Sequence, residues 1–364
     1  MTAVIEGGPT AAATPPPEPE KFDVREWFDT LGGIARIAVS LLGALVIFGV
    51  IMRLKGANPL TAYHDMLSST FKSWDSMGDI LVRATPIILA ALAVSVPARA
   101  GLINVGGEGQ LLMGGIAGMG TSLALGTRLP GTVTLILMVL AAALGGAAWA
   151  ALAAVLRQFM GISESVTTLL LNYVALDIMF FLIYDRWKDR SGSGQPTSRA
   201  LPVEQRLPLL FGRVHAGILI AVGAALIIGL IFAFTSWGFR LRVVGGNAEA
   251  ARRSGLKVGA LLISAMAVGG ALAGIGGLTQ LAGAEFKLRS GFVAGYGYIG
   301  FLASWLGRHR PGYVVLSALL LSTIVIGGDS LQIDSQLPAA SVNVLMAVTL
   351  LMVFGFGRRK AAAT

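Results

Sequence analysis

The sequence predicts an all-α, polytopic membrane protein with about ten transmembrane helices and both termini on the cytoplasmic side. Of its 364 residues, 55% are hydrophobic and only 13% are charged, whereas a soluble domain carries about 25% charged residues. The apolar residues form continuous runs, several of which reach the roughly 20 residues that cross a bilayer. Because these runs do not alternate with polar residues, a transmembrane β-barrel is excluded.

The order of these runs divides the chain. Residues 1–30 contain PTAAATPPPEPE and are predicted to form a disordered cytoplasmic tail, because such a composition cannot build a packed core. Residues 31–358 form the transmembrane domain, with an external loop at about 185–213. The expected spans are 33–53, 82–98, 109–126, 131–156, 164–184, 214–236, 259–281, 291–306, 312–327 and 339–356.

The orientation follows from the short loops. Arg308 and Arg310 lie between two expected spans, and Arg358, Arg359 and Lys360 follow the last one. Short loops rich in Lys and Arg stay in the cytoplasm. An even number of spans then places both termini inside.

Several function classes are absent from the pattern. The chain has no cysteine and only three histidines, which lie far apart, so thiolate chemistry, disulfides and a histidine metal cluster are not expected. No phosphate-binding Gly-x-x-x-x-Gly-Lys-Ser/Thr string is present. The net charge of +9 fits membrane-proximal Lys and Arg better than a nucleic-acid surface. We therefore expect no cofactor, no metal and no nucleic-acid partner.

A short polar segment, VVGGNAEAARRSGLKV at 243–258, interrupts two apolar runs. Asn247 can accept a hydrogen bond from the first turn of a helix, Glu249 suits that turn, and Gly255 can end the helix. The segment predicts a short cytoplasmic helix at about 247–255, whose small Ala250 and Ala251 suggest a close fit into a groove on another protein. A solvated loop that only joins two spans is the alternative.

A second polar segment, ARAGLINVGGEGQLLMGGIAG at 98–118, carries Asn104, Glu108 and Gln110 among glycines. Buried polar groups in lipid need partners or a water-filled cavity. The segment predicts a broken, re-entrant helix at about 101–110 that lines a translocation pathway. A tight turn between helices, with Glu108 capping the N-terminus of the next helix, is the alternative.

Isolated polar and aromatic residues within spans are further pathway candidates. The amide of Asn172 can pair with sugar hydroxyls or with nucleobase edges, and Tyr296 could stack on a base. The alternatives are an interhelical hydrogen bond for Asn172 and ordinary packing for the tyrosine.

The motifs resemble one known family. Glu249, Ala250, Ala251 and Gly255 are similar to the EAA loop of ATP-binding-cassette (ABC) importer permeases, although the Ile-x-Leu-Pro part of that pattern is not evident. The string Asn104-x-Gly-x-Glu108-Gly-Gln110 resembles the nucleoside and simple-sugar branch, which is related to ribose and branched-chain amino acid permeases. Blocks at 164–176 and 295–311 also resemble this branch.

The resemblance implies a permease subunit in the bacterial cytoplasmic (inner) membrane. Its partners would be ABC ATPase subunits, a second permease subunit and an extracytoplasmic substrate-binding protein, and ATP would be hydrolysed on the separate ATPase. The residues implied to couple to the ATPase are Gly246, Asn247, Glu249, Ala250, Ala251 and Gly255. A purine nucleoside is the favoured cargo, with a simple sugar or a riboflavin-like solute as alternatives. An ion-coupled secondary transporter is the alternative from another class.

Overall fold

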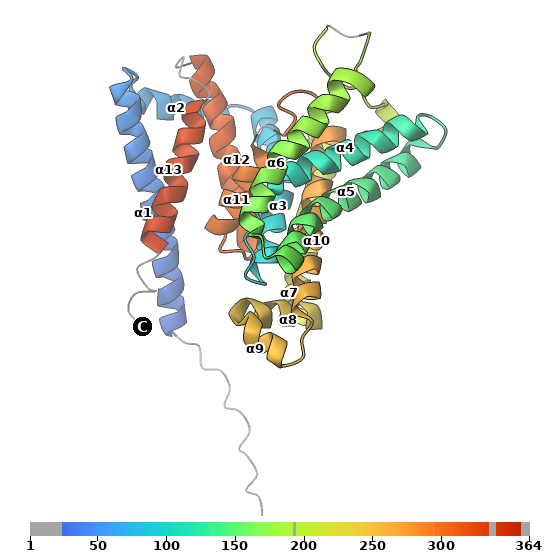
Figure 1. Cartoon of the computed structure of the whole chain (residues 1–364). Coiled ribbons are helices and arrows are strands. Elements are labelled where there is room, and N and C mark those ends of the chain that lie inside the picture. The colour runs from blue at the N-terminus through green and yellow to red at the C-terminus, as the bar shows by residue number, and fades with distance from the viewer. Residues whose placement is uncertain (1–23, 192–193, 294, 335–339, 358–364) are drawn as a thin grey trace, which may run out of the picture.

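The computed structural model describes residues 24–191, 194–293, 295–334 and 340–357. The predicted tail at 1–30 lies outside the described residues up to residue 23, and the first helix already covers residues 24–30. The described chain is a bundle of α-helices (Figure 1). These helices are α1 (Val24–Leu54), α2 (Pro59–Thr70), α3 (Trp74–Ala98), α4 (Gly107–Leu125), α5 (Gly131–Met160), α6 (Glu164–Phe181), α7 (Gly217–Phe234), α8 (Ser236–Gly246), α9 (Ala248–Arg253), α10 (Val258–Gln280), α11 (Tyr296–Leu306), α12 (Pro311–Asp334) and α13 (Ala340–Gly357).

The centre of the bundle is α3, which is buried on every side over residues 84–97 and contacts α7, α10, α11 and α12. A helix that is hydrophobic all round is stable only when other helices surround it. Next to α3, α10 packs along α5 through a strip of small residues. Gly270 and Gly274 lie directly against the α5 backbone at Gly146, so the two helices approach more closely than side chains would allow.

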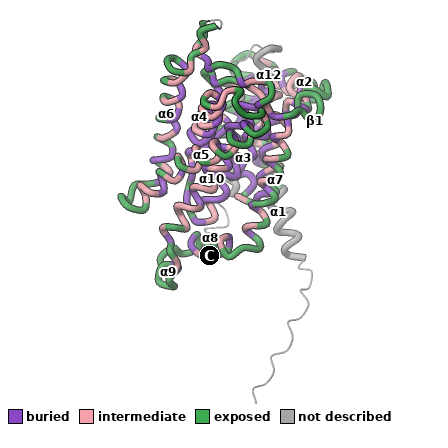
Figure 2. Tube along the Cα trace, turned by 90° about the vertical axis from the view of Figure 1, so that its right-hand side faces the viewer, coloured by how far each residue is buried: buried purple, intermediate pink, exposed green. Residues whose placement is uncertain are grey.

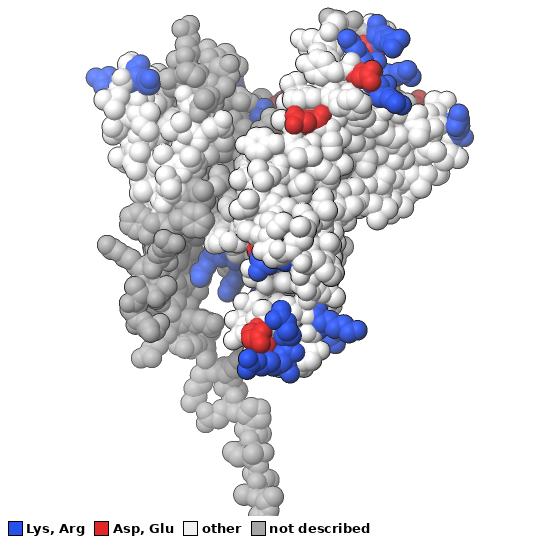
Figure 3. Space-filling model, viewed as in Figure 1, with Lys and Arg blue, Asp and Glu red and all other residues white. Residues whose placement is uncertain are grey.

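Six of the described helices are long and apolar enough to cross a membrane, and the pair α1–α2, bent by 119°, would make a seventh. Charged side chains on the visible face gather mainly toward its two ends (Figure 3). The chain is thus a multi-pass membrane protein, while the count of ten spans stays a prediction.

The expected span at 291–306 is shorter than predicted, because it is helical only from Tyr296. Gly291 and Gly295 have φ values of +77° and +86°, which glycine adopts readily but which a right-handed helix excludes. The 11 residues of α11 rise about 16 Å, half of the hydrocarbon core.

The described part of residues 185–213 forms a cover at one end of the bundle (Figure 1). They include a 3₁₀ turn (Val203–Gln205) and β1 (Leu209–Phe211), which pairs antiparallel with β2 (Val214–His215). This hairpin corrects the purely helical expectation. The backbone N–H groups of Ser198, Leu201 and Leu207 donate to carbonyls of residues 282–288 at 2.7–2.9 Å, which ties the cover to the chain just after α10.

The opposite end of the bundle carries α8 and α9. The first helix begins and α13 ends toward this same end (Figure 1). The start of α1 and the end of α13 thus lie at one end of the bundle, while the cytoplasmic location of both termini stays a prediction.

Candidate functional site

A non-helical segment, called the break below, separates α3 from α4 at the predicted position; its re-entrant course stays a prediction. The N–H of Leu102 donates to Pro97 O and that of Gly101 to Ala98 O, both at 3.1 Å, and Gly101 has a φ of +78°. This is the usual hydrogen-bond pattern of a glycine-terminated helix. Residues 102–106 are then non-helical, and α4 starts at Gly107.

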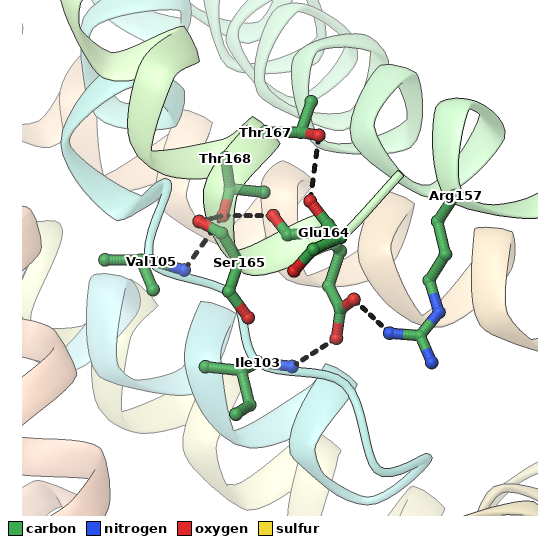
Figure 4. A network of polar contacts seen from close by, with 8 residues as sticks. Ile103, Val105, Arg157, Glu164, Ser165, Thr167 and Thr168 are labelled. Atoms are coloured by element: carbon green, nitrogen blue, oxygen red, sulfur yellow. Dashed lines mark hydrogen bonds and ion pairs between the residues drawn. The ribbon is translucent and has the colours of Figure 1, made fainter. Parts of the chain in front are cut away.

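Side chains on one face of α6 form hydrogen bonds with the non-helical peptide groups of this break. This stripe consists of Glu164, Thr168 and Asn172, spaced four residues apart and therefore on one helix face. The N–H of Ile103 donates to Glu164 Oε1 at 3.1 Å, and that of Val105 to Thr168 Oγ1 at 3.2 Å (Figure 4). The Asn172 Nδ2 group donates to Val105 O at 3.0 Å. Buried peptide groups are thereby paired, as an apolar environment requires.

The charge of Glu164 is neutralised at the edge of the bundle. The second oxygen of its buried carboxylate forms an ion pair with Arg157 of α5, whose side chain is 40% exposed (Figure 4). Breaking such a pair would leave a buried charge without compensation. The sequence analysis missed both Glu164 and Thr168, although their regular spacing with Asn172 was the available signal.

Asn104 and Gln110 bind each other within the break. Asn104 Nδ2 donates to Gln110 Oε1 at 3.0 Å, and Gln110 Nε2 donates to Asn104 Oδ1 at 2.9 Å. Asn104 also donates to Ala93 O at 3.0 Å and accepts from Gly106 N at 3.0 Å. Both side chains are at most 1% exposed. The two buried amides thus hold the break through hydrogen bonds to each other and to the backbone.

Glu108 joins the beginnings of two helices. It lies in the first turn of α4, and its carboxylate accepts hydrogen bonds from Gly295 N at 2.8 Å and Gly297 N at 2.7 Å, at the start of α11. A negative charge is favourable at a helix N-terminus. Glu108 thus lies at the N-terminus of the next helix, as the alternative proposed, and its hydrogen bonds also cap α11, which is far away in the sequence. Gly297 permits the contact, since a Cβ there would lie 2.0 Å from Glu108 N.

Asn172 connects the break to an exposed aromatic residue. Its Oδ1 accepts from Gly109 N at 2.8 Å, and its Nδ2 lies 3.3 Å from Tyr298 Oη. Tyr298 is 39% exposed, whereas the predicted Tyr296 is 8% exposed. The aromatic surface beside the break thus belongs to Tyr298 and to Tyr173 on α6, which is 60% exposed. A phenol ring beside an amide can stack on a planar ligand and hydrogen-bond to it.

The second polar segment forms α9, as its capping residues predict. Asn247 Oδ1 accepts from Ala250 N at 2.9 Å. At the other end, Gly255 has a φ of +84°, and its N–H donates to Arg252 O at 3.0 Å. The helix is capped at both ends and lies beyond the spanning helices, at the end opposite the cover (Figure 1).

The two faces of α9 differ in burial. Ala251 is 1% exposed and packs with Val244 of α8 and Val258 of α10. The expectation that Ala251 faces a groove on a partner is therefore wrong, since this methyl group attaches α9 to its own chain. Glu249 and Ala250 are exposed, and Figure 2 shows the exposed colour along much of α9.

The charged side chains on the exposed face of α9 form ion pairs with one another. Glu249 forms ion pairs with Arg252 at 2.9 Å and with Arg253 at 3.1 Å. Gly246, just before the cap, is exposed, and no side chain lies above it. The outer face thus exposes small residues together with one glutamate that is paired with two arginines.

These features define a class: a membrane transport component with a polar helix break inside the bundle and a short capped helix beyond its spans. A comparison with known protein families makes the assignment specific, because residues 76–354 match one family of permeases. The chain belongs to the family of permease components of branched-chain amino acid transport systems.

Three relatives are similar over most of their length. The chain is 35% identical to the glucose ABC transporter permease protein of Haloferax volcanii, covering 86% of this chain and 85% of the relative. It is 29% identical to the guanosine ABC transporter permease protein of Bacillus subtilis, covering 86% and 91%. It is also 29% identical to the nucleoside ABC transporter permease protein of Lactococcus lactis, covering 88% and 89%.

Proposed function

We propose that the chain is the permease subunit of an ATP-driven importer and that it moves a purine nucleoside across the bacterial cytoplasmic membrane. The observation that carries the proposal is α9. A six-residue helix is too short to be stable by itself, yet here it is capped at both ends and presents an uncovered polar face. A loop that only joined two spans would need neither feature.

In this proposal α9 receives the motion of an ABC ATPase that hydrolyses ATP on a separate subunit. Glu249 and Ala250 contact the ATPase, while Gly246, Asn247 and Gly255 set the ends and the angle of the helix. Ala251 contributes indirectly, because its buried contact transmits a displacement of α9 to α8 and α10. An ion-coupled transporter would have no use for this helix.

The polar break is proposed to border the translocation pathway. Within it, Asn104, Glu108 and Gln110 hold the non-helical segment open, and Asn172 positions the exposed ring of Tyr298. A second permease subunit, either a homologue or another copy, completes the pathway. An extracytoplasmic binding protein delivers the cargo on the side of residues 185–213.

A purine nucleoside is proposed because it needs both stacking and hydrogen bonding. Tyr298 and Asn172 provide these two interactions, and two of the three relatives are named for guanosine or nucleoside transport. A simple sugar is the second candidate, since the relative at 35% identity is named for glucose. A riboflavin-like solute is the third. Competition of labelled guanosine uptake by unlabelled nucleosides, glucose and riboflavin ranks the three, and strong inhibition by glucose alone would replace the nucleoside proposal.

The proposed orientation has ten spans with both termini in the cytoplasm. Since the chain contains no cysteine, Ser254→Cys beside α9 and Ser191→Cys in the cover give single labelling positions, and both residues are exposed. In intact cells an impermeant thiol reagent should label only the cysteine at 191. Labelling at 254 instead would reverse the orientation.

The coupling role is tested by Ala250→Trp. This bulky side chain on the exposed face of α9 should leave membrane insertion intact but release the ATPase subunits on detergent extraction, with loss of transport. Ala233→Trp, an equally large change at an exposed position on α7, is the control and should retain the ATPase. Stoichiometric ATPase with Ala250→Trp, together with normal substrate-stimulated ATP hydrolysis, would make α9 a simple connector.

A further inference from the structure

Three arginines meet at the end of the bundle that carries α8 and α9. Arg99 directly follows α3, and its guanidinium carbon lies 4.7 Å from the ring centroid of Phe232, near the end of α7. Arg242 of α8 donates from Nη2 to the carbonyl oxygen of the same Phe232 at 3.4 Å. One residue of α7 therefore brings two positive charges together.

The third arginine, Arg310, lies in the turn before α12. A chain of hydrogen bonds fixes this turn to α3: Ser95 Oγ lies 2.8 Å from Ser304 Oγ, which lies 2.9 Å from His309 Nδ1. His309 and the preceding Arg308 have φ values of +56° and +52°, which are strained for residues other than glycine. The fold thus holds Arg310 toward the end of α3 in spite of local strain.

No carboxylate balances these charges within the described residues. None of the ion pairs formed there involves Arg99, Arg242 or Arg310. In the same part of the chain, the buried Nε of Arg99 has no hydrogen-bond partner. Burial, and then the charges of Arg242 and Arg310, lower the pKa of Arg99. Converging charges and an unpaired buried donor are unfavourable unless an anion completes them.

The position of the cluster indicates which anion fits. The spanning helices α3 and α7 end beside it, and α12 starts there, so the cluster lies at the depth where lipid phosphates meet the ends of spans. Arg242 and Arg310 are exposed, as are Phe234 (82%) and Phe239 (62%), which lie between Phe232 and Arg242 in the sequence. An acyl chain can lie on these rings while guanidinium groups bind the phosphate.

We propose that Arg99, Arg242 and Arg310 form a binding site for a phosphate-bearing anion, supplied either by an acidic lipid of the adjoining leaflet or as free phosphate. Arg99 directly precedes the polar break, but the proposed site does not include the side chains that hold the break or those proposed to meet the cargo. Its occupation would hold together the ends of α3, α7 and α8 and the start of α12, next to the helices proposed to receive the ATPase motion.

The test measures thermal unfolding of the complete transporter after delipidation in detergent. Phosphatidylglycerol should raise the Tm, because a ligand that binds only the folded state stabilises it, whereas zwitterionic phosphatidylcholine should not. Arg310→Gln, at an exposed position, should raise the half-saturating lipid concentration about fivefold, which corresponds to ~1 kcal/mol for each basic side chain at an anionic surface. Arg99→Gln should act in the same direction. Arg240→Gln neutralises an exposed arginine of α8 outside the cluster and should keep the wild-type response.

A parallel titration with inorganic phosphate separates the two sources. A Tm rise with phosphate alone that Arg310→Gln removes identifies free phosphate, and a rise with phosphatidylglycerol alone identifies the lipid. An identical response to both probes in the wild type, Arg99→Gln and Arg310→Gln would overturn the site. Loss of the ATPase from Arg310→Gln with an unchanged lipid response would also overturn it, and would assign the cluster to a protein partner.

Discussion

Two short polar segments of this chain look alike in sequence and differ in what they contact. Residues 98–110 and 243–258 are both rich in glycine, both contain a glutamate and an asparagine, and both separate apolar runs. In the first segment Asn104 and Gln110 are buried and bonded within the chain. In the second, Glu249 and its arginine partners are exposed. The difference shows that composition identifies a polar interruption, while burial decides whether it is structural or forms a contact surface.

This difference has an energetic consequence. Leaving a buried donor or acceptor without a partner costs about 1–3 kcal/mol, whereas an exposed ion pair contributes about 0–1 kcal/mol. Substitutions in the break should therefore reduce stability and transport together. Substitutions on the outer face of α9 should affect transport with little change in stability.

The largest effect is expected for Glu108→Ala. The N–H groups of Gly295 and Gly297 lose their acceptors, so the free energy of unfolding in detergent should fall by about 2–4 kcal/mol, and transport should fall with it. Glu204→Gln, an exposed change in the cover, serves as the control. Normal stability and normal transport of Glu108→Ala would remove the distinction between the two segments.

Thr168→Val tests the α6 stripe with little change of shape. The Val105 N–H loses its acceptor, and we expect a loss of about 1–2 kcal/mol in the same unfolding measurement. Thr167→Val is the matched control, because the Thr167 hydroxyl donates to the carbonyl of Ser163, the residue just before α6, and not to the break. Equal losses for the two variants would show that the stripe does not support the break.

Gly255→Ala should cost about 1 kcal/mol, because the positive φ at the end of α9 is unfavourable for alanine. We also expect a reduced ratio of transport to ATP hydrolysis, since the angle of α9 would change. Gly126→Ala is the control: Gly126 also has a positive φ and open space, but it ends α4 far from α9. Comparable loss of stability with coupling reduced only by Gly255→Ala is the expected outcome.

The smallest effect on stability is expected for Glu249→Gln. It removes two exposed ion pairs of α9, so the free energy of unfolding should change by no more than about 0.5 kcal/mol. Equilibrium unfolding of the isolated permease measures this change. A loss as large as that of Thr168→Val would show that the outer face of α9 is part of the core.

The sequence predicts those features that depend on contacts between residues close together in the chain. Asn247 and Gly255 specify both ends of α9 through contacts within a few residues, and glycines specify the break. The hydrogen-bond partners of the break lie on α6 and at the start of α11. They are distant in the sequence, so no local sequence pattern identifies them. The pairing of Glu108 with Gly297 spans 189 positions. The burial of Ala251 was also missed, because it depends on how α9 packs against α8 and α10.

One helix joins the two ends of the molecule. At its first residue, Val258, α10 contacts the buried face of α9. Its 23 residues extend about 35 Å, and a π-helical turn, Leu281–Glu285, follows directly. Ala282 in that turn accepts the hydrogen bond from Leu207 of the opposite cover. Because α10 is a continuous helix, a displacement along its axis at one end would move its other end as well. The π-helical turn is the first irregular backbone that such a displacement would reach.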